Sequence, residues 1–556
     1  SDITIQNVTF NGNSGEYPRI YSIMSDLSIY NSTFKNQEAS SGSFLYSSQS
    51  NVTIKESSFV NGTSRDDGGA ISMSASNICI DNCEFKYLNA RIRGGAIYGI
   101  LRTNFTVKNS VFRNTNAGER GAAISYERSS LKLDNSDISS SSNICISGRY
   151  SFQTLITNSV LKNCSGLLTG GVLIYESDFF KIKNSSFRNC FGGNDGYGGG
   201  IILESVYSPA KSEFEVSDCE FTNNTSLYGG ALHAFGVPVK IENSTFSSNS
   251  AEKGGAVYLE SSFNENGKFK IYNSSFNSNK ASKEGGAIKW DDYRPQLRDV
   301  TFTNNLAPYG NDLASYPTAI IQVGSNSSVL QNTSYPVIGK VTNAPPGQAI
   351  SESIQIGLYD QYGSLVKVDN SSEAKITTDD SSLSVAGGTT AVAVSGVLSF
   401  KDLIIYAKPS SKFYILVYTS GIDPKKQESS NDQFEYVNKA YLEVTTRACQ
   451  MGETKTSKSC DVCERGTYSL SPQKQCKKCP NNAECLGNFT IFPEPGYWRA
   501  SVHSDKIFKC KVPEACLGSV DYTGQLGNCS KGYTDNICGI CEEGYSKLAN
   551  GSCSPC

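Results

Sequence analysis

The chain has 556 residues, of which 38% are hydrophobic and 19% are charged, and its 50 basic and 53 acidic side chains give a net charge of −3. Because nucleic-acid binding needs a concentrated positive surface, this balance and the lack of a basic tract in the sequence exclude nucleic acid as a partner. Only two histidines, His233 and His503, are present. Imidazole catalysis and histidine-ligated metal are therefore poorly supported, and we expect no cofactor and no metal.

Residues 1–320 repeat one pattern twelve times. Each unit has an apolar anchor, an amide or carboxylate three residues before it and an aliphatic residue five residues before it. The anchors are Phe10, Phe34, Phe59, Phe85, Phe112, Ile138, Leu161, Phe187, Phe221, Phe246, Phe276 and Phe302. Apolar residues alternate at period two, and glycine pairs follow most anchors. A repeat of this length with strand alternation predicts an all-β chain that begins with a right-handed parallel β-helix of about twelve coils.

The polar position before each anchor is the most uniform one in the repeat. It is asparagine at Asn7, Asn31, Asn82, Asn109, Asn135, Asn158, Asn184, Asn243 and Asn273. The alternation predicts that these side chains point inward. Because a lone buried amide is costly, we expect them to form a hydrogen-bonded ladder between coils, with Glu56, Asp218 and Asp299 fitting the same row. The anchors are expected to form an aromatic column inside the coils.

Two pairs of motifs in this repeat resemble those of a known family. Phe246-Ser-Ser-Asn249 precedes Gly254-Gly255-Ala256-Val257, and Phe276-Asn-Ser-Asn279 precedes Gly285-Gly286-Ala287-Ile288. They resemble the FxxN and GGA(I/L/V) motifs of the chlamydial polymorphic outer-membrane proteins. The resemblance covers residues 1 to about 315 and implies an adhesin-like β-helical rod at a cell surface.

Cysteines and glycosylation sequons indicate the compartment. The chain has 19 Cys, thirteen of them within residues 449–556, and seventeen Asn-x-Ser/Thr sequons. Together they predict an extracellular or cell-surface glycoprotein from the oxidising secretory pathway of a eukaryote. We expect the five sequons in the polar row to carry no glycan, because those amides should point inward. The remaining candidate acceptors are Asn51, Asn61, Asn104, Asn163, Asn223, Asn224, Asn326, Asn332, Asn370, Asn488, Asn528 and Asn550.

One disulfide is predicted from the register. Cys164 lies three residues after the anchor Leu161, and Cys190 lies three residues after Phe187. Equal offsets in consecutive coils place their Cα atoms about 4.8 Å apart, which is inside the disulfide range. We therefore predict a Cys164–Cys190 bridge.

Residues 335–446 have a different pattern, with short alternating strands separated by turns. About seven strands in this length predict a β-sandwich. The strings Tyr359-Asp-Gln-Tyr-Gly363 and Gly396-Val-Leu-Ser-Phe400 resemble Ig-like surface modules of bacteria and protists, which implies a spacer or a contact surface.

Residues 447–556 form a cysteine-rich segment with four Cys-x-x-Cys pairs. In a cytosolic protein the first two pairs would indicate a zinc ribbon, but the surrounding cysteines and sequons favour disulfides. Cys463-Glu-Arg-Gly-Thr-Tyr468 and Cys541-Glu-Glu-Gly-Tyr545 resemble EGF-like and GCC2/GCC3-type modules. Gly496-Tyr-Trp-Arg499 with its following cysteines resembles the cysteine-rich segment of large ciliate-type protist surface proteins, in which membrane helices follow. The longest apolar run, near Phe413–Val417, is too short to span a membrane, so a tether is expected only outside this sequence.

Three functions are consistent with these features. The first is a non-enzymatic structural subunit of a surface coat, appendage or filament, which assembles with itself or with other surface proteins through a first coil that starts at Ser1 without a cap. The second is a membrane-tethered adhesin or receptor that binds glycan or protein along the coils. The third, a polysaccharide-active enzyme, needs clustered carboxylates on one face.

The charged side chains in the repeat argue against that enzyme, because most lie in turns. We expect Asp67 beside Arg93 and Lys253 beside Glu284, as solvated pairs worth little energy. The other acidic candidates, Asp195 and Asp291-Asp292, lie on unrelated coils.

Overall fold

The computed structural model describes residues 2–12, 14–207, 213–261, 269–291, 293–324, 336–423, 438–472 and 475–556. Its contacts divide the chain into two compact units. The first contains Ser1–Ala319 and the short segment Tyr359–Asp369, and the second contains Ile320–Leu358, Asn370–Gly421 and Val437–Cys556. The described residues contain no helix long and apolar enough to cross a membrane.

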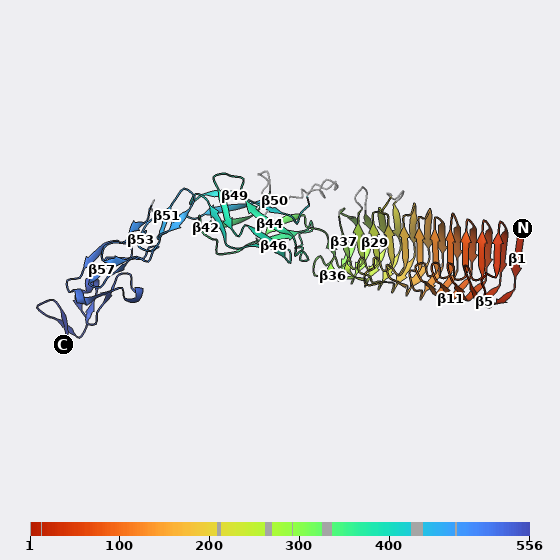
Figure 1. Cartoon of the computed structure of the whole chain (residues 1–556), viewed down its shortest axis with the longest axis horizontal. Helices are drawn as coiled ribbons and strands as arrows, with labels where there is room; N and C mark the ends of the chain where they lie inside the picture. The colour runs from red at the N-terminus through yellow and green to blue at the C-terminus, as the bar shows by residue number, and fades with distance from the viewer. Residues whose placement is uncertain are drawn as a thin grey trace. The chain divides into compact units, whose positions relative to one another are not determined.

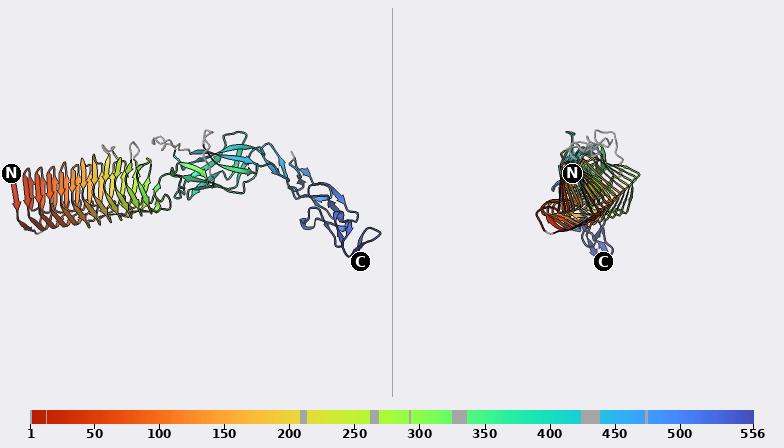
Figure 2. Two further views of the ribbon diagram at one scale, coloured as in Figure 1. Left: turned by 180° about the vertical axis from the view of Figure 1, so that it is seen from behind. Right: turned by 90° about the vertical axis from the view of Figure 1, so that its right-hand side faces the viewer.

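The first unit is a parallel β-helix built from three twelve-stranded sheets (Figures 1 and 2). The first sheet consists of β1 (Asp2–Gln6), β4 (Asp26–Tyr30), β7 (Asn51–Lys55), β10 (Asn77–Asp81), β13 (Asn104–Lys108), β16 (Ser130–Asp134), β19 (Gln153–Thr157), β23 (Phe180–Lys183), β27 (Phe214–Ser217), β30 (Val239–Glu242), β34 (Lys270–Tyr272) and β38 (Gln296–Arg298). The second consists of β2 (Thr9–Asn11), β5 (Thr33–Ala39), β8 (Ser58–Ser64), β11 (Glu84–Ala90), β14 (Val111–Ala117), β17 (Asp137–Ser139), β20 (Val160–Lys162), β24 (Ser186–Arg188), β28 (Glu220–Thr222), β31 (Thr245–Ser247), β35 (Ser275–Asn277) and β39 (Thr301–Thr303).

The third sheet carries the site described below. It consists of β3 (Ile20–Ile23), β6 (Leu45–Ser48), β9 (Ile71–Ser74), β12 (Ile97–Ile100), β15 (Ile124–Glu127), β18 (Ile146–Arg149), β22 (Val172–Tyr175), β26 (Ile201–Glu204), β29 (Leu232–Phe235), β33 (Val257–Glu260), β37 (Ile288–Trp290) and β40 (Leu313–Ala314). Two short pairs, β21 (Ser165–Gly166) with β25 (Phe191–Gly192) and β32 (Ser250–Lys253) with β36 (Lys280–Glu284), extend the corner between the second and third sheets.

The register predicted from the repeat is confirmed. Phe10 pairs with Phe34, and Phe246 pairs with Phe276, as the anchor spacing requires. The anchor rings stack inside the coils, with centroids 4.9 Å apart for Phe34 and Phe59 and 4.7 Å apart for Phe246 and Phe276. Aliphatic residues of all three sheets fill the remaining interior, so the core is one continuous column.

The predicted inward direction of the polar row is wrong. All nine asparagines are exposed, and their φ values of 44° to 56° place them in the left-handed region at the corner between the first and second sheets. Asparagine tolerates this conformation better than most residues, which explains its selection there. Parts of the row are still linked outward between neighbouring coils, as in the bond from Asn31 Nδ2 to Asn7 Oδ1 (2.8 Å), whereas Asn109 and Asn158 donate to Asp81 and Asp134 beside the row. The five sequons in this row therefore lie on the surface, and burial does not remove them from the candidate acceptors.

The inward polar positions belong to other residues. Serine follows the exposed asparagine in most coils, and its hydroxyl accepts a backbone N–H from the preceding coil, as Ser136 Oγ, after Asn135, does from Ser110 N (3.2 Å). In the last coils, Asn224, Asn249, Asn279 and Asn305 form a buried amide ladder with links of 3.0 Å. These are the asparagines three residues after the anchors, as in the two FxxN motifs, so the inward ladder exists on the opposite side of each anchor.

The predicted Cys164–Cys190 disulfide is also wrong. Cys164 is bonded to Cys145 across a corner of the coil, and Cys190 is a buried free thiol. Equal positions in adjacent parallel coils give side chains that run side by side, whereas a disulfide needs Cβ vectors that converge. The register fixes the Cα spacing of the two cysteines but not the direction of their side chains.

The segment Tyr359–Asp369 packs against the last coils of the first unit. Trp290, which is fully buried, donates from Nε1 to the Tyr362 hydroxyl (3.1 Å), and Tyr309 donates to Asp360 Oδ2 (2.8 Å). These contacts cover the apolar column at that end, because the aromatic side chains of the segment lie over its last residues. Nothing in the repeat indicated this cover.

The second unit begins with an eight-stranded sheet. Its strand order is β41 (Ala319–Gln322), β43 (Ile354–Tyr359), β47 (Val397–Phe400), β46 (Thr390–Val394), β44 (Glu373–Thr377), β49 (Lys412–Thr419), β50 (Lys439–Thr446) and β42 (Val337–Ala344). A two-stranded sheet of β45 (Ser384–Gly387) and β48 (Leu403–Tyr406) accompanies it. The all-β character is confirmed, whereas the Ig-like assignment stays a prediction.

The cysteine-rich segment consists of small hairpins and 3-10 turns held by six disulfides. The hairpins pair β51 (Glu453–Lys455) with β52 (Cys460–Val462), β53 (Thr467–Tyr468) with β54 (Lys477–Lys478), β55 (Ala483–Glu484) with β56 (Phe492–Pro493), β57 (Tyr497–Arg499) with β58 (Ile507–Lys509), β59 (Cys516–Gly518) with β60 (Asn528–Cys529), β61 (Tyr533–Thr534) with β62 (Ile540–Cys541), and β63 (Tyr545–Lys547) with β64 (Cys553–Pro555). The turns are η2 (Pro513–Ala515), η3 (Val520–Tyr522) and η4 (Asn536–Cys538). The bonds join Cys449–Cys460, Cys463–Cys476, Cys479–Cys485, Cys510–Cys516, Cys529–Cys538 and Cys541–Cys553. Three of the four Cys-x-x-Cys pairs are thus divided between different bonds, and in the fourth Cys553 is bonded to Cys541 while Cys556 is a free, exposed thiol. The disulfide interpretation therefore holds against the zinc ribbon.

Candidate binding groove on the third sheet

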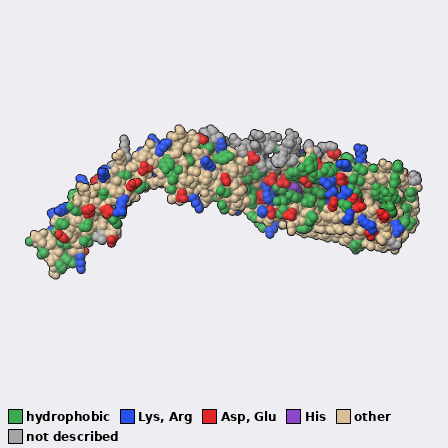
Figure 3. All heavy atoms as spheres, in the orientation of Figure 1, with side chains coloured by type: hydrophobic (Ala, Val, Ile, Leu, Met, Phe, Trp, Pro, Cys, Tyr) green, Lys and Arg blue, Asp and Glu red, His purple; other side chains and the backbone are tan. Residues whose placement is uncertain are grey.

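The outer face of the third sheet collects charged and aromatic side chains. In each strand the first and third residues fill the core, and the second and fourth point outward because strand side chains alternate. In β26, β29 and β33 the outward pairs are Ile202 and Glu204, His233 and Phe235, and Tyr258 and Glu260. Figure 3 shows apolar, acidic and basic side chains gathered on one face of the coils. We call this outer face, with the residues of the adjoining corner, the third-sheet groove.

In one section of the groove, which we call closed, a cation of the chain itself pairs with the carboxylates. The Arg93 guanidinium lies over the Tyr98 ring, 4.5 Å from its centroid, and pairs with Asp67 (2.8 Å) and Glu127 (3.4 Å). The predicted Asp67–Arg93 neighbours are confirmed. Their side chains are 14% and 23% exposed, however, so the pair is more sheltered than the solvated ladder expected from the sequence.

A second section is closed by lysines. Lys253 Nζ lies 2.8 Å from Glu284, which confirms the other predicted pairing, although Glu284 is buried and not solvated as expected. The buried Lys289 Nζ lies 2.7 Å from Asp291. The Tyr258 hydroxyl bonds Asp291 Oδ2 (2.7 Å), and burial together with the nearby carboxylates raises the pKa of that hydroxyl. Acid and base therefore neutralise each other along this section.

Between the two closed sections the groove is open. A pocket of about 330 Å³ is lined there by Leu168, Leu173, Tyr197, Ile202, Glu204, His233, Phe235 and Glu260. The walls are mostly apolar and aromatic, with two carboxylates and one imidazole. This combination of an apolar cavity and a few polar groups is the usual composition of a ligand pocket.

His233 is fixed firmly in this pocket. Its ring lies between the rings of Tyr197 (centroids 4.9 Å apart) and Tyr258 (5.4 Å), and Nε2 lies 2.9 Å from Glu260 Oε2. Because an ionised carboxylate only accepts, Nε2 carries a proton. His233 is only 4% exposed, and its Nδ1 is buried without a hydrogen-bond partner in the part of the chain that the structure describes.

Glu204 is the second uncompensated group. Burial raises the pKa of its carboxyl, and the nearby His233 and Arg149 offset this only in part. Among the residues with described positions, no hydrogen bond or ion pair to the Glu204 side chain is found, whereas Glu260 bonds both His233 and the Tyr258 hydroxyl (2.6 Å). A half-buried carboxylate in this state is costly unless a ligand compensates it.

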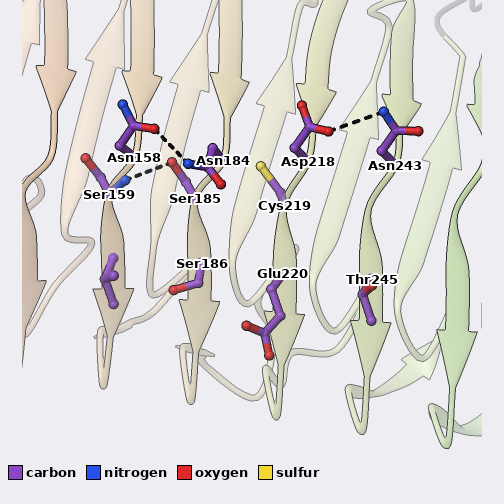
Figure 4. Close-up of a pocket in the computed structure, with 11 residues that line it drawn as sticks. Asn158, Ser159, Asn184, Ser185, Ser186, Asp218, Cys219, Glu220, Asn243 and Thr245 are labelled. Atoms are coloured by element: carbon purple, nitrogen blue, oxygen red, sulfur yellow. Dashed lines mark hydrogen bonds between the residues drawn. The ribbon is translucent and has the colours of Figure 1, made fainter.

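A larger hollow of about 560 Å³ lies over the exposed asparagine row (Figure 4). Its polar groups already bond one another, as in the links Asn184–Asn158 (2.8 Å) and Asn243–Asp218 (3.2 Å). The ladder is interrupted between Asn184 and Asp218, because a carboxylate cannot donate to an amide oxygen. Glu56, Asp218 and Asp299 keep their predicted places in the row, with φ values of 47°, 54° and 54°, but Asp218 accepts a ladder bond without passing one on.

The candidate glycan acceptors differ in accessibility. Asn224 is fully buried in the amide ladder, so it cannot accept a glycan without loss of that ladder. Asn326 and Asn332 lie outside the described residues. Asn528 is half-buried. The remaining candidates are exposed, and they are Asn51, Asn61, Asn104, Asn163, Asn223, Asn370, Asn488 and Asn550.

The sequence did not single out the pocket residues. His233 stood out only as one of two histidines, and neither Glu204 nor Glu260 was among the acidic candidates. Asp291, which was one of them, bonds Tyr258 across adjacent strands. Asp195 is exposed outside the pocket, and Asp292 lies outside the described residues. A usable signal was present: Glu204 and Glu260 both end the strand that follows a glycine corner, which places them in one outward row on either side of Phe235.

No metal site emerges from the described residues. Cys449, Glu453 and Cys460 lie close enough to hold an ion, but the two sulfurs form a disulfide and the Glu453 carboxylate is bonded to Arg447 (2.7 Å). Neither thiolate is free to act as a ligand.

Parts of the repeat match two known protein families. Residues 64–205 match the family described as right handed beta helix region, and residues 243–260 and 273–289 match the Chlamydia polymorphic membrane protein repeat. No curated protein matches the chain. The repeats and the seven disulfides are those of a surface or secreted protein.

Proposed function

We propose that this chain is a non-enzymatic extracellular glycoprotein of a eukaryotic secretory pathway, which acts as an adhesin or receptor and binds a partner through the open section of the third-sheet groove. The observation that carries the proposal is the pair of uncompensated polar groups, Glu204 and His233 Nδ1, in a pocket whose neighbours on both sides are internally neutralised. A rigid column of paired coils supports this face, because every strand of the third sheet is fixed by the register of the next.

The carboxylates of the groove do not favour catalysis. General acid–base chemistry on a polysaccharide needs two carboxyl groups available to substrate. Glu260 is occupied by His233 and Asp291 by Lys289, and the Tyr258 hydroxyl lies between the two carboxylates and donates its one proton to either. Glu204 alone remains, which supports binding rather than turnover.

A structural role in a coat or filament is the second candidate function. It is favoured by a patch of exposed apolar side chains on and just after β3, where Tyr21, Ile23 and Met24 are 57%, 49% and 70% exposed. Apolar surface of this kind is usual at contacts between proteins. This role is compatible with a binding groove several coils away.

The proposal is tested by blocking the pocket. Leu168, a lining residue that is 48% exposed, would be changed to Arg, and the neighbouring Leu167, which is 80% exposed and not in the lining, would receive the same change as a matched control. Labelled wild-type protein and both variants would be applied to arrays of defined peptides and glycans and to a panel of soluble polysaccharides.

We expect a set of array ligands whose binding is lost in Leu168→Arg and kept in Leu167→Arg, with no polysaccharide degraded. Equal binding by all three proteins would contradict a role for the pocket, and depolymerisation that is lost in Glu204→Gln would contradict the non-enzymatic assignment.

A further inference from the structure

The third-sheet groove contains its own example of how it accommodates a cation. Arg93 lies four residues before Ile97, the first residue of β12, and it reaches Glu127, the last residue of the adjacent strand β15. Its guanidinium is held by Asp67, Glu127 and the face of Tyr98. A cation between carboxylates and over an aromatic ring gains both Coulombic and cation–π energy.

Part of this geometry recurs at the pocket without the cation, and there Leu173, the second residue of β22, takes the place of Tyr98, the second residue of β12. Leu168 lies four residues before Val172, the first residue of β22, and Glu204 is the last residue of the adjacent strand β26. Leu168 therefore stands where Arg93 stands, and Glu204 stands where Glu127 stands. In the next two coils the same corner position is held by Tyr197 and Tyr228. The first basic residue at this position after Leu168 is Lys253, which is already paired with Glu284. The internal ladder of charges thus has a gap at the pocket.

The chemistry of the gap defines what fills it. The Glu204 carboxylate accepts hydrogen bonds, so the ligand must supply donors. Leu168, Leu173, Ile202 and the rings of Tyr197 and Phe235 surround it, so the ligand must also carry an apolar stem. A long aliphatic chain that ends in an ammonium or guanidinium group meets both requirements, since such side chains bury their methylenes and keep the charged end at polar groups.

We propose that the pocket binds the side chain of a lysine or arginine presented by a partner protein, with the cationic end between Glu204 and His233 and the stem against the apolar wall. This inference rests on the proposed binding function and names the ligand class of the same site. The partner is a protein with a protruding basic side chain, because one side chain matches a pocket of about 330 Å³ that opens on a regular sheet face.

The test uses the intact chain and three small probes. Nα-acetyl-lysine methylamide and Nα-acetyl-arginine methylamide carry the cation, and Nα-acetyl-norleucine methylamide offers the stem without the charge. Saturation-transfer NMR titrations would give an apparent affinity for wild type, Leu168→Arg, Leu167→Arg and Glu204→Gln. Thermal unfolding of each variant checks that the fold is retained, and Leu167→Arg adds the same charge one residue away from the pocket.

We expect the cationic probes to bind wild type at least tenfold more tightly than norleucine. Their affinity should fall at least tenfold in Leu168→Arg and in Glu204→Gln, and it should change less than twofold in Leu167→Arg. Equal binding of norleucine, no binding of any probe, or equal losses in Leu167→Arg and Leu168→Arg would overturn the inference.

The array experiment separates this inference from the proposed function. If ligands without basic groups bind on the array and are lost only in Leu168→Arg, the pocket is a binding site but not for a cation. If no ligand depends on Leu168, both proposals fail.

Discussion

The coils of the first unit and the cysteine-rich segment show two ways of stabilising a chain that has little helix. The coils pair each strand with the next over three sheets and bury a continuous apolar column, and they contain one disulfide, Cys145–Cys164. The cysteine-rich segment has short hairpins and six disulfides, and Arg499, a fully buried guanidinium that donates to backbone carbonyls, lies at its centre. Repetition allows the coils to depend on nearest neighbours, whereas the irregular segment depends on covalent links.

Reduction of the disulfides should separate the two regions most strongly. Loss of a native disulfide from a small domain costs about 2–5 kcal/mol, so six losses should unfold residues 449–556, while the coils lose only one bond. Hydrogen exchange followed by mass spectrometry after mild reduction would show this. Complete exchange in β57 and β58 with continued protection of β11 and β14 is expected, and equal loss of protection in both regions would contradict the comparison.

The buried amide ladder should matter far more than the exposed one. Asn249 Nδ2 donates to Phe221 O and Asn279 Oδ1, and its own Oδ1 accepts from Asn224. Asn249→Ala leaves these buried groups unpaired and should lower the free energy of unfolding by about 3 kcal/mol. The matched control Asn243→Ala, on the exposed row of the same coil, should lower it by less than about 1 kcal/mol. Denaturant titrations measure both, and comparable losses would argue against an inward role for the FxxN asparagine.

The single disulfide of the coils offers a smaller test. Cys145→Ser opens a bridge that spans 19 residues, and the loss expected for a loop of this size is about 3 kcal/mol at most. In the wild type the free Cys190 thiol is fully buried, and burial raises its pKa to about 12. This thiol should therefore neither react with thiol reagents nor form a cross-link, and Cys190→Ser should remove no bond. Peptide mapping under non-reducing conditions should find Cys145–Cys164. A Cys164–Cys190 peptide would restore the pairing predicted from the register.

The smallest expected effect concerns Glu204. Because burial raises the pKa of its carboxyl, the folded state binds a proton more tightly than the unfolded chain. Ionisation of Glu204 therefore costs stability above its unfolded pKa, and protonation removes that cost as the pH falls. Glu204→Gln should raise the melting temperature slightly at pH 7 and leave it unchanged at pH 4. Equal shifts at both pH values would show that the carboxyl is not penalised by burial.

The sequence predicted the coils well because they repeat. Twelve copies of one pattern fix the strand period, the register and the stacked anchors, and hence the neighbours Asp67–Arg93 and Lys253–Glu284. It predicted side-chain direction poorly at the corners, because a left-handed residue such as Asn7 reverses the alternation on which the inward assignment rested.

The pocket could not be predicted in the same way. In the pocket, Leu168 stands at the corner position that Arg93 holds in an earlier coil. The absence of a basic side chain at Leu168 is recognised only when the two positions are compared in the structure. The cover from Tyr359–Asp369 was likewise hidden, since it comes from a distant segment of the chain that does not share the repeat.

The central claim, that the open section of the groove is a binding site, is tested most directly by the nitrogen resonances of the histidine rings. The chain has only His233 and His503, so protein labelled with 15N at histidine gives a simple spectrum, which His503→Gln assigns. The account predicts that Nα-acetyl-lysine methylamide shifts His233 Nδ1 and leaves His503 unchanged, and that Leu168→Arg abolishes the response. A His233 Nδ1 resonance that does not move at saturating probe, or that moves equally in Leu168→Arg, would contradict it.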